Sequence, residues 1–234
     1  MSKLYLIPTT LGNTAPEQVL PAGTLEALRA LRVFVVEELR SARRFLSAAG
    51  FRGHVEELEL HTLNEHSTPA EVAALGSLFE RGDAGLITEA GLPAVADPGS
   101  ALVALCHTLG VQVVPLVGPS SLMLALMASG LDGQSFAFRG YLPAKTEERR
   151  AAIRRMEKDS AALRQTQIFI ETPYRNDALL ADFLSGLSGS TMLCIAADLT
   201  LPTETVLSLS VAEWRRKAGF TIGKRPCVFL ILAR

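Results

Sequence analysis

The sequence predicts an α/β protein of two lobes, the first with a mostly parallel sheet and the second with a mixed sheet. Up to about residue 116, short apolar runs alternate with amphipathic stretches, which is typical of parallel strands joined by covering helices. After residue 117, an apolar helix precedes strands of mixed spacing and one long charged helix. The predicted lobes are therefore residues 1–116 and 117–234, and we expect a ligand cleft between them.

The expected strands and helices follow from hydrophobic spacing and from capping residues. In the first lobe, strands are expected at 4–7, 33–37, 55–60, 85–88 and 111–116, and helices at 25–31, 41–49, 69–81 and 100–109. Thr68, Pro69 and Glu71 form the capping signature that starts the third of these helices. In the second lobe, a helix at 120–129 is followed by strands at 136–141, 167–171, 192–197, 206–209 and 227–232.

The composition is that of a globular protein with a large core. Of the 234 residues, 48% are apolar and 20% are charged, which excludes a disordered chain and a coiled coil. The net charge of -1 gives no general attraction to nucleic acid or to an anionic membrane, so a polyanion would need a local basic patch. The three cysteines lie far apart in apolar stretches, which favours reduced thiols and a cytoplasmic location. Neither a secretory leader nor a membrane span is expected, because the apolar runs are short or broken by proline.

Several motifs of common enzyme classes are missing. The sequence contains no Gly-x4-Gly-Lys-Ser/Thr loop, no Gly-x-Gly-x-x-Gly after the first strand and no Gly-x-Ser-x-Gly elbow. These absences disfavour nucleotide hydrolysis, dinucleotide redox chemistry and acyl-enzyme hydrolysis. His61, Asn64, Glu65 and His66 form one polar cluster, but their spacing matches no known ligand set, so no metal is expected.

The segment 86–99, LITEAGLPAVADPG, is the clearest candidate for a ligand-binding loop. A buried strand there runs into two Gly-Pro-rich turns, and Gly91 and Gly99 allow the backbone to come close to a bound molecule. Glu89 and Asp97 supply carboxylates at the carboxyl end of the strand, where open α/β sheets bind ligands. The alternative is that each turn is only a sharp connection.

Other polar segments at strand ends also admit two interpretations. Glu38 and Arg40 either form surface ion pairs or face the cleft, and Thr172 either caps a helix or contacts a ligand. The basic segment that begins at Lys145 and includes Arg149 is either a solvated helix face or a contact for RNA phosphates.

Taken in order, short motifs along nearly the whole chain resemble the tetrapyrrole methylase superfamily of S-adenosylmethionine-dependent methyltransferases, and most closely its rRNA small subunit methyltransferase I branch. No single motif is specific, but the collinear set is. The motifs are Pro8-Thr9-Thr10-Leu11-Gly12-Asn13, Glu37-Glu38-Leu39-Arg40, His61 with Asn64-Glu65, Glu89-Ala90-Gly91-Leu92-Pro93, Ala96-Asp97-Pro98-Gly99, Val117-Gly118-Pro119-Ser120-Ser121, Gly140-Tyr141-Leu142-Pro143-Ala144-Lys145, Glu171-Thr172-Pro173-Tyr174-Arg175 and Asp198-Leu199-Thr200.

The resemblance implies two α/β lobes, a homodimer, and S-adenosylmethionine bound in the cleft between the lobes. In that superfamily the cofactor is held largely by backbone and apolar contacts, which agrees with the missing glycine fingerprint. The cofactor-binding residues implied for this chain are Pro8, Thr9, Gly91, Leu92, Val95, Asp97, Ser120, Ser121, Glu171, Thr172, Ala197 and Leu199.

The resemblance also implies a methyl acceptor, and the expected acceptor is a ribose 2′-hydroxyl of small-subunit rRNA or of a related RNA. A ribose hydroxyl must lose its proton during the transfer, and the candidate general bases are Glu38, Glu89 and Lys145. The candidate substrate-binding residues are Asn13, Arg40, His61, Asn64, Arg149 and Arg175. Two alternatives stay open: methylation of a small molecule such as a tetrapyrrole, and a relative that binds S-adenosylmethionine or RNA without catalysis.

The chain departs from the branch at three motifs. The branch usually has Asp-Thr-Arg where Glu38-Leu39-Arg40 stands, and a second Gly-Asp where Thr14-Ala15-Pro16 stands. It also has a lysine where Leu201 stands. These differences bear on the substrate more than on the cofactor.

Overall fold

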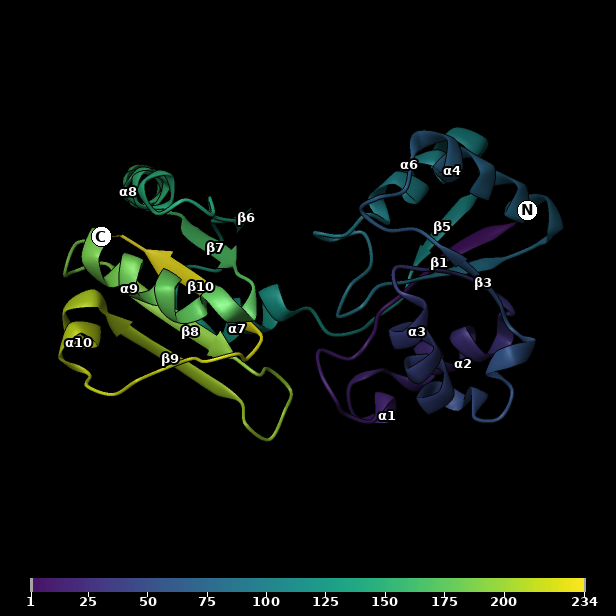
Figure 1. Ribbon diagram of the computed structural model, residues 1–234, viewed down its shortest axis with the longest axis horizontal. Helices are drawn as coiled ribbons and strands as arrows, with labels where there is room; N and C mark the ends of the chain where they lie inside the picture. Colours follow the sequence, from purple (N-terminus) through teal and green to yellow (C-terminus); the bar gives the residue numbers. More distant parts are fainter. Residues whose placement is uncertain (1, 234) are drawn as a thin grey trace. The chain divides into compact units, whose positions relative to one another are not determined.

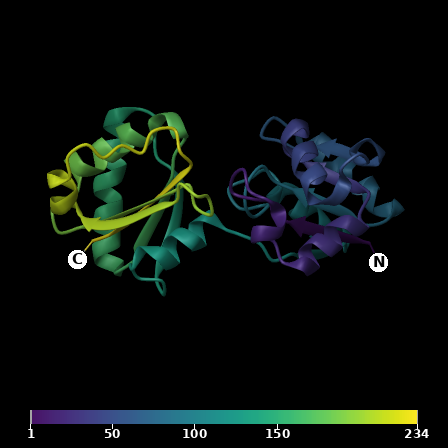
Figure 2. The same cartoon turned by 90° about the horizontal axis from the view of Figure 1, so that it is seen from below.

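The computed structural model describes residues 2–233 and contains two compact units, of which one ends at Ser120 and the other begins at Ser121. Each unit has its own sheet, and no strand within the described residues is shared between them (Figure 2). The boundary expected after residue 116, as a division into independent folding units, stays a prediction.

The first unit contains a five-stranded sheet in the order β3-β2-β4-β1-β5. Its strands are β1 (Lys3–Ile7), β2 (Val33–Val36), β3 (Glu59–Thr62), β4 (Ala84–Ile87) and β5 (Gln112–Pro115). All four pairings are parallel, which confirms the predicted parallel sheet. Ile87 is paired with Ile7 on one side and with Val36 on the other, so the carboxyl ends of β1, β2 and β4 lie level at one edge.

Helices cover both faces of this sheet (Figure 1). The helices of the unit are α1 (Pro16–Val19), α2 (Ala22–Ala30), α3 (Leu39–Leu46), α4 (Pro69–Ala74), α5 (Leu78–Arg81) and α6 (Ser100–Leu109), with short helical turns at Ser47–Phe51, Val55–Glu57 and Leu75–Ser77. Side chains alternate along β2: Phe34 and Val36 pack with α2 and α3, whereas Val35 packs with the α5 and α6 side. The first unit is therefore a three-layer structure with two separate apolar cores.

One predicted strand is wrong in its position. The sequence favoured a strand at 55–60, but Val55–Glu57 is a helical turn and β3 begins only at Glu59. Val55 and Leu58 are three residues apart, which places them on one side of a turn, and the ladder to β2 fixes the strand by pairing Val33 with Glu59 and Val36 with Thr62.

The second unit contains a mixed five-stranded sheet in the order β6-β7-β10-β8-β9. Its strands are β6 (Phe136–Tyr141), β7 (Thr166–Ile170), β8 (Met192–Ala197), β9 (Thr205–Ser210) and β10 (Cys227–Leu232). β6 and β7 are parallel and the other pairings are antiparallel, as the predicted mixed sheet requires. Val228 of β10 lies between Ile170 and Ala196, so β7 and β8 end at the same edge, where β10 begins.

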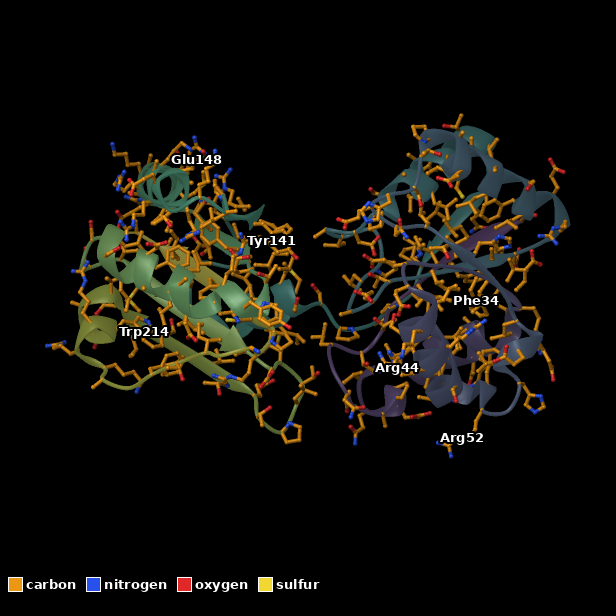
Figure 3. All side chains as sticks on the ribbon, viewed as in Figure 1. Phe34, Arg44, Arg52, Tyr141, Glu148 and Trp214 are labelled. Atoms are coloured by element: carbon orange, nitrogen blue, oxygen red, sulfur yellow. The ribbon has the colours of Figure 1, made fainter. Side chains whose placement is uncertain are left out.

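Helices of the second unit bury the two faces of this sheet unequally. They are α7 (Ser121–Ser129), α8 (Thr146–Leu163), α9 (Asn176–Gly186) and α10 (Val211–Arg216), and Pro173–Arg175 forms a short turn before α9. The main core joins Ile153 of α8, Phe183 of α9 and Trp214 of α10 to alternate residues of the strands. The Trp214 indole, labelled in Figure 3, donates a hydrogen bond to the Leu193 carbonyl at 2.8 Å. This bond satisfies the one polar atom of a large buried side chain.

All three cysteines are buried and free, and burial raises the pKa of the Cys106 and Cys194 thiols to about 11. Desolvation raises the pKa of Cys227 further, to about 12. No helix among residues 2–233 is long and apolar enough to cross a bilayer.

Candidate functional site

Three strands of the first unit deliver polar residues to one edge of its sheet. Thr9 follows β1, Glu37 follows β2, and Thr88 and Glu89 follow β4. Because these strands are parallel and end level, the residues lie side by side: the Glu37 carboxylate (Oε2) accepts hydrogen bonds from the Thr88 hydroxyl at 3.3 Å and from the Glu89 amide at 3.4 Å.

The loop after β4 is held in a strained and defined conformation. Ala94 and Ala96 have φ of 64° and 56°, values that residues with a Cβ seldom adopt. Asp97 supports this conformation, because its carboxylate (Oδ1) accepts hydrogen bonds from the Ala94 amide at 3.0 Å and from the Gly99 amide at 2.6 Å. The carbonyl of Gly91 accepts a hydrogen bond from the Thr9 amide at 2.9 Å, which ties the loop to the end of β1. Strain that is held in this way is typical of ligand-binding loops.

A pocket of about 480 Å³ opens at this edge. It is lined by Thr9, Thr10, Leu11, Gly12, Asn13, Thr14, Pro16, Ser41, Arg44, Phe45, Ala48, Glu89 and Ala90. Its walls are the turn after β1, one side of α3 and the start of the loop after β4. The pocket joins an apolar floor to a carboxylate, hydroxyls and a guanidinium, which is the usual composition of a small-molecule or nucleoside site.

Polar side chains meet across the pocket. The Ser41 hydroxyl donates a hydrogen bond to Glu89 Oε1 at 3.4 Å. Arg44 is exposed on α3 (Figure 3), and it lines the pocket. Thr9 is only 2% exposed, and its hydroxyl oxygen has no hydrogen-bond partner within the described chain. A buried hydroxyl without a partner is costly, so it points to a ligand group that completes the hydrogen bonding.

Glu37 is the titratable residue at this edge that sequence reasoning missed. Burial raises the pKa of Glu37 above its ordinary value of 4.5, and the neighbouring Asp97 and Glu89 carboxylates add to the rise. The signal in the sequence was the order of residues: Glu37 directly follows the last residue of β2, whereas the predicted candidate Glu38 lies one residue further along.

Glu38 caps α3. Its two carboxylate oxygens accept hydrogen bonds from the Arg40 amide at 2.8 Å and from the Ser41 amide at 2.6 Å. These amides lower the pKa of Glu38. A carboxylate with a lowered pKa is a weaker base, so the structure gives the Glu38 side chain a capping role that sequence reasoning did not assign to it.

The second unit also gathers polar residues where β7 and β8 end. Glu171 is 6% exposed, and its Oε1 atom accepts hydrogen bonds from the Thr172 amide at 2.6 Å and from the Arg175 guanidinium at 2.6 Å. The other carboxylate oxygen, Oε2, has no partner within residues 2–233. After β8, Asp198 and Thr200 have φ of 52° and 73°, and the buried Thr200 hydroxyl also lacks a partner within the described residues.

These features fit a cofactor that offers hydroxyl or amine donors and apolar surface. Glu171 Oε2 is a buried acceptor that a ribose hydroxyl or an amino group would satisfy. Ala197, the last residue of β8, and Leu199, two residues later, are buried and offer apolar and backbone contact at the same edge of the sheet. In the first unit, Gly118 lies so close to Pro8 that a Cβ at that position would be 2.3 Å from the Pro8 Cβ atom. The predicted cofactor residues Ser120 and Ser121 lie two and three residues after Gly118.

The predicted substrate-binding residues have different surroundings. Arg149 is 6% exposed and forms a buried ion pair with Asp182. Arg175 is paired with Glu171, whereas Asn13 lines the pocket of the first unit. Lys145, a candidate base, is exposed at the start of α8 and lies 3.2 Å from Glu148.

His61, Asn64 and Arg40 lie outside the pocket lining. His61 Nε2 is hydrogen-bonded to Glu59 Oε1 at 2.7 Å, and Glu59 also pairs with Arg81. Asn64 closes its own turn by accepting from the His66 amide at 2.9 Å. Between residues 2 and 233, no three His, Cys, Asp or Glu side chains are grouped closely enough to hold a metal ion.

Most of the chain is similar to known methyltransferases. Residues 3–214 match the model of the tetrapyrrole (corrin/porphyrin) methylases. The chain is 35% identical to ribosomal RNA small subunit methyltransferase I of Vibrio cholerae, over 90% of this chain and 69% of that protein. It is 33% identical to the protein of the same name from Escherichia coli O157:H7, over 90% of this chain and 70% of the relative.

A solved structure shares the fold. Uroporphyrin-III C-methyltransferase from Thermus thermophilus, determined in complex with S-adenosylhomocysteine, superposes with a TM-score of 0.57 at 17% identity. The match covers 99% of this chain and 97% of the other.

Proposed function

The chain belongs to the tetrapyrrole methylase family and is an S-adenosylmethionine-dependent methyltransferase, and from this premise we propose that it methylates a ribose 2′-hydroxyl of small-subunit ribosomal RNA. The relatives that match 90% of the chain at 33–35% identity are named ribosomal RNA small subunit methyltransferase I. An RNA substrate, a homodimer and a cytoplasmic location belong to the same proposal.

The observation that carries the proposal is the pocket beside Thr9, Ser41, Arg44 and Glu89. Its volume of about 480 Å³ suits one nucleoside, and its lining includes Phe45 and Leu11 as apolar contacts for a base. Arg44 provides a cation for a phosphate, and the Glu89 and Ser41 side chains provide an acceptor and a hydroxyl for a sugar.

When bound, S-adenosylmethionine supplies a methyl group on a sulfonium, whose leaving group is already activated. The task of the chain is therefore to align the acceptor oxygen and to exclude water. We assign the binding of S-adenosylmethionine to the cofactor-binding residues that the family resemblance implies. Among them, Glu171 Oε2 would accept a hydrogen bond from a hydroxyl or amino group of the cofactor. The strained loop 89–99 presents Gly91 and Leu92 in a fixed conformation, because Asp97 and Thr9 hold it.

The acceptor hydroxyl must also lose a proton, and the first-unit edge offers two carboxylates for this. Glu89 lies in the pocket lining, and Glu37 lies directly behind it, hydrogen-bonded to the Glu89 amide. We assign removal of the acceptor hydroxyl proton to Glu37 and Glu89. The raised pKa makes the Glu37 carboxylate a stronger base than an ordinary glutamate, whereas the capping hydrogen bonds of Glu38 make that carboxylate a weaker one.

The proposal is tested with the purified protein and ribosomal RNA from a strain in which the gene is deleted. We expect calorimetry to detect binding of S-adenosylmethionine and S-adenosylhomocysteine. We also expect the protein to restore one 2′-O-methyl mark that the deletion strain lacks. Mapping of 2′-O-methylation along the small-subunit rRNA locates the mark.

One outcome contradicts the rRNA part of the proposal. An unchanged methylation map, together with cofactor binding, rejects the rRNA substrate and leaves a methyltransferase with another acceptor. Uroporphyrinogen III, assayed in parallel, then tests whether that acceptor is a tetrapyrrole.

A further inference from the structure

Tyr174 is an exposed aromatic side chain that belongs to none of the three apolar cores. It lies in the turn Pro173–Arg175 after β7, and it is 80% exposed. The Lys224 ammonium lies 4.9 Å from the centroid of the Tyr174 ring. This distance is within the range at which a cation is attracted to the face of an aromatic ring.

The segment that carries Lys224 is fixed to the chain just beyond Tyr174. Asp177 Oδ1 accepts a hydrogen bond from the Ile222 amide at 2.7 Å, and Asp177 Oδ2 accepts one from the Gly223 amide at 3.1 Å. The side-chain amide of Asn176, which is fully buried, donates to the Arg225 carbonyl at 2.7 Å. Asn176 and Asp177, two and three residues after Tyr174, therefore hold the loop that brings the Lys224 ammonium to the Tyr174 ring.

The turn that carries Tyr174 is fixed from its other side. Arg175 donates to Glu171 Oε1 through Nε at 3.0 Å and through Nη2 at 2.6 Å, and its amide donates to the Thr172 carbonyl at 2.9 Å. The two backbone segments that carry the ring and the ammonium are thus fixed before any ligand binds. Such preorganisation reduces the entropy that binding would cost.

The position of the pair matters as much as its rigidity. β7 and β8 end beside the first residues of β10, and the loop of Lys224 leads into β10 at this point. Glu171 and Thr200, with their unpartnered buried oxygens, belong to the same edge. An exposed aromatic ring with a cation is therefore placed at the ligand-binding edge of the second unit.

We propose that Tyr174 and Lys224 form a platform on which one unpaired base of the RNA substrate stacks, with the ammonium near the adjoining phosphate. Single-stranded RNA is recognised by stacking of splayed bases on aromatic side chains, and a nearby cation attracts the negatively charged phosphates of the RNA backbone. The inference rests on the proposed RNA substrate and adds a contact outside the pocket of the first unit.

The test uses a single-stranded RNA 12-mer that contains 2-aminopurine, whose fluorescence falls when the base stacks. Tyr174→Ala is expected to weaken binding about 5- to 150-fold and to abolish the quenching, as loss of one stacked base does. Tyr174→Phe, which keeps the ring, should bind within about 2-fold of the unaltered protein. Lys224→Ala should lower the slope of log K against log salt by about one.

Phe136→Ala is the matched control, because Phe136 is an aromatic residue, 40% exposed, at the first position of β6 and so at the opposite edge of the same sheet. This variant should bind the 12-mer as the unaltered protein does. Calorimetry with S-adenosylmethionine should give equal affinities for all these variants.

Several results would overturn the platform. One is equal RNA binding by Tyr174→Ala and Phe136→Ala, and another is no RNA binding by the unaltered protein. If Tyr174→Ala loses affinity only for S-adenosylmethionine or only for uroporphyrin III, the Tyr174 ring contacts that ligand and not RNA. The proposed function fails separately: an unchanged rRNA methylation map with a Tyr174-dependent RNA affinity rejects the rRNA target and keeps the platform.

Discussion

Arg149 and Asp182 form a buried ion pair that joins α8 to α9. Arg149 Nη2 lies 2.6 Å from Asp182 Oδ2, and the two side chains are 8% and 5% exposed. Arg149 also donates to the Ala144 carbonyl at 2.8 Å, and Arg150 donates to Asp182 Oδ1 at 2.8 Å. Burial opposes ionisation of Asp182, but hydrogen bonds from Arg150 and Arg149 outweigh it and hold the pKa below its ordinary value of 3.8.

Asp182→Ala should destabilise the protein, because it leaves the buried Arg149 guanidinium without its counter-charge. Removing one partner of a buried pair costs about 3–5 kcal/mol. We expect a loss of this size in the free energy of unfolding of the second unit, measured by urea denaturation. Arg154→Ala, an exposed position on the same helix, should leave the stability within about 0.5 kcal/mol. A small effect of Asp182→Ala would mean that water reaches the guanidinium.

Glu37→Gln should remove proton acceptance at the proposed site while making the protein more stable at neutral pH. The pKa of Glu37 in the folded protein lies above its ordinary value of 4.5, so the folded state holds this proton more tightly than the unfolded state does. The Glu37 contribution to stability is therefore lost as pH rises from 4.5 through the folded pKa. The variant should have the higher Tm at pH 8, and the advantage should shrink toward pH 4.

Glu38→Gln is the comparison for this experiment. Backbone amides lower the pKa of Glu38, so its contribution has the opposite sign: it is present above 4.5 and is lost as pH falls through the folded pKa. Glu38→Gln should lower Tm at pH 8.

The same two variants are compared in activity. Methyl transfer should fall about 10²-fold or more in Glu37→Gln if the Glu37 carboxylate accepts the proton of the acceptor hydroxyl. Equal activity of the two variants argues against that role.

Arg44→Ala should weaken substrate binding without unfolding the first unit. Arg44 is exposed and lines the pocket, and a charge-assisted hydrogen bond to a phosphate accounts for about a 10- to 100-fold change in KM. Arg43→Ala is the matched control, because Arg43 is an exposed arginine of the same helix outside the pocket lining. Titration with S-adenosylmethionine should not distinguish the two variants. If both raise KM equally, the effect comes from the general charge of α3.

Much of the architecture was predictable because hydrophobic spacing and strand-end chemistry are local signals. The parallel sheet, the mixed sheet and the loop after β4 follow from them. The roles of individual charges are decided by tertiary contacts: Glu37 and Glu38 are adjacent, yet one is desolvated beside Asp97 and the other caps a helix. Arg149 likewise looks like its exposed neighbours in sequence, and its partner Asp182, which stabilises it in a buried position, is 33 residues away.

Gly118→Ala should impair cofactor binding through a collision that the sequence does not reveal. A Cβ at Gly118 would lie 2.3 Å from Pro8 Cβ and 3.0 Å from Leu20 Cδ2, and the proline ring cannot rotate away. The segment that leads to Ser120 must then shift relative to the end of β1. Overpacking of this kind costs about 1–3 kcal/mol of unfolding free energy.

The matched change is Gly133→Ala, because no atom lies within 4 Å of a Cβ at Gly133. That variant should keep both stability and affinity for S-adenosylmethionine. Gly118→Ala should lose at least about 10-fold in affinity by calorimetry, since a displaced Pro8 and Ser120 no longer present their contacts together. If Gly118→Ala loses stability but binds the cofactor normally, then the close approach of Gly118 to Pro8 serves folding alone, and the assignment of Pro8 to the cofactor fails.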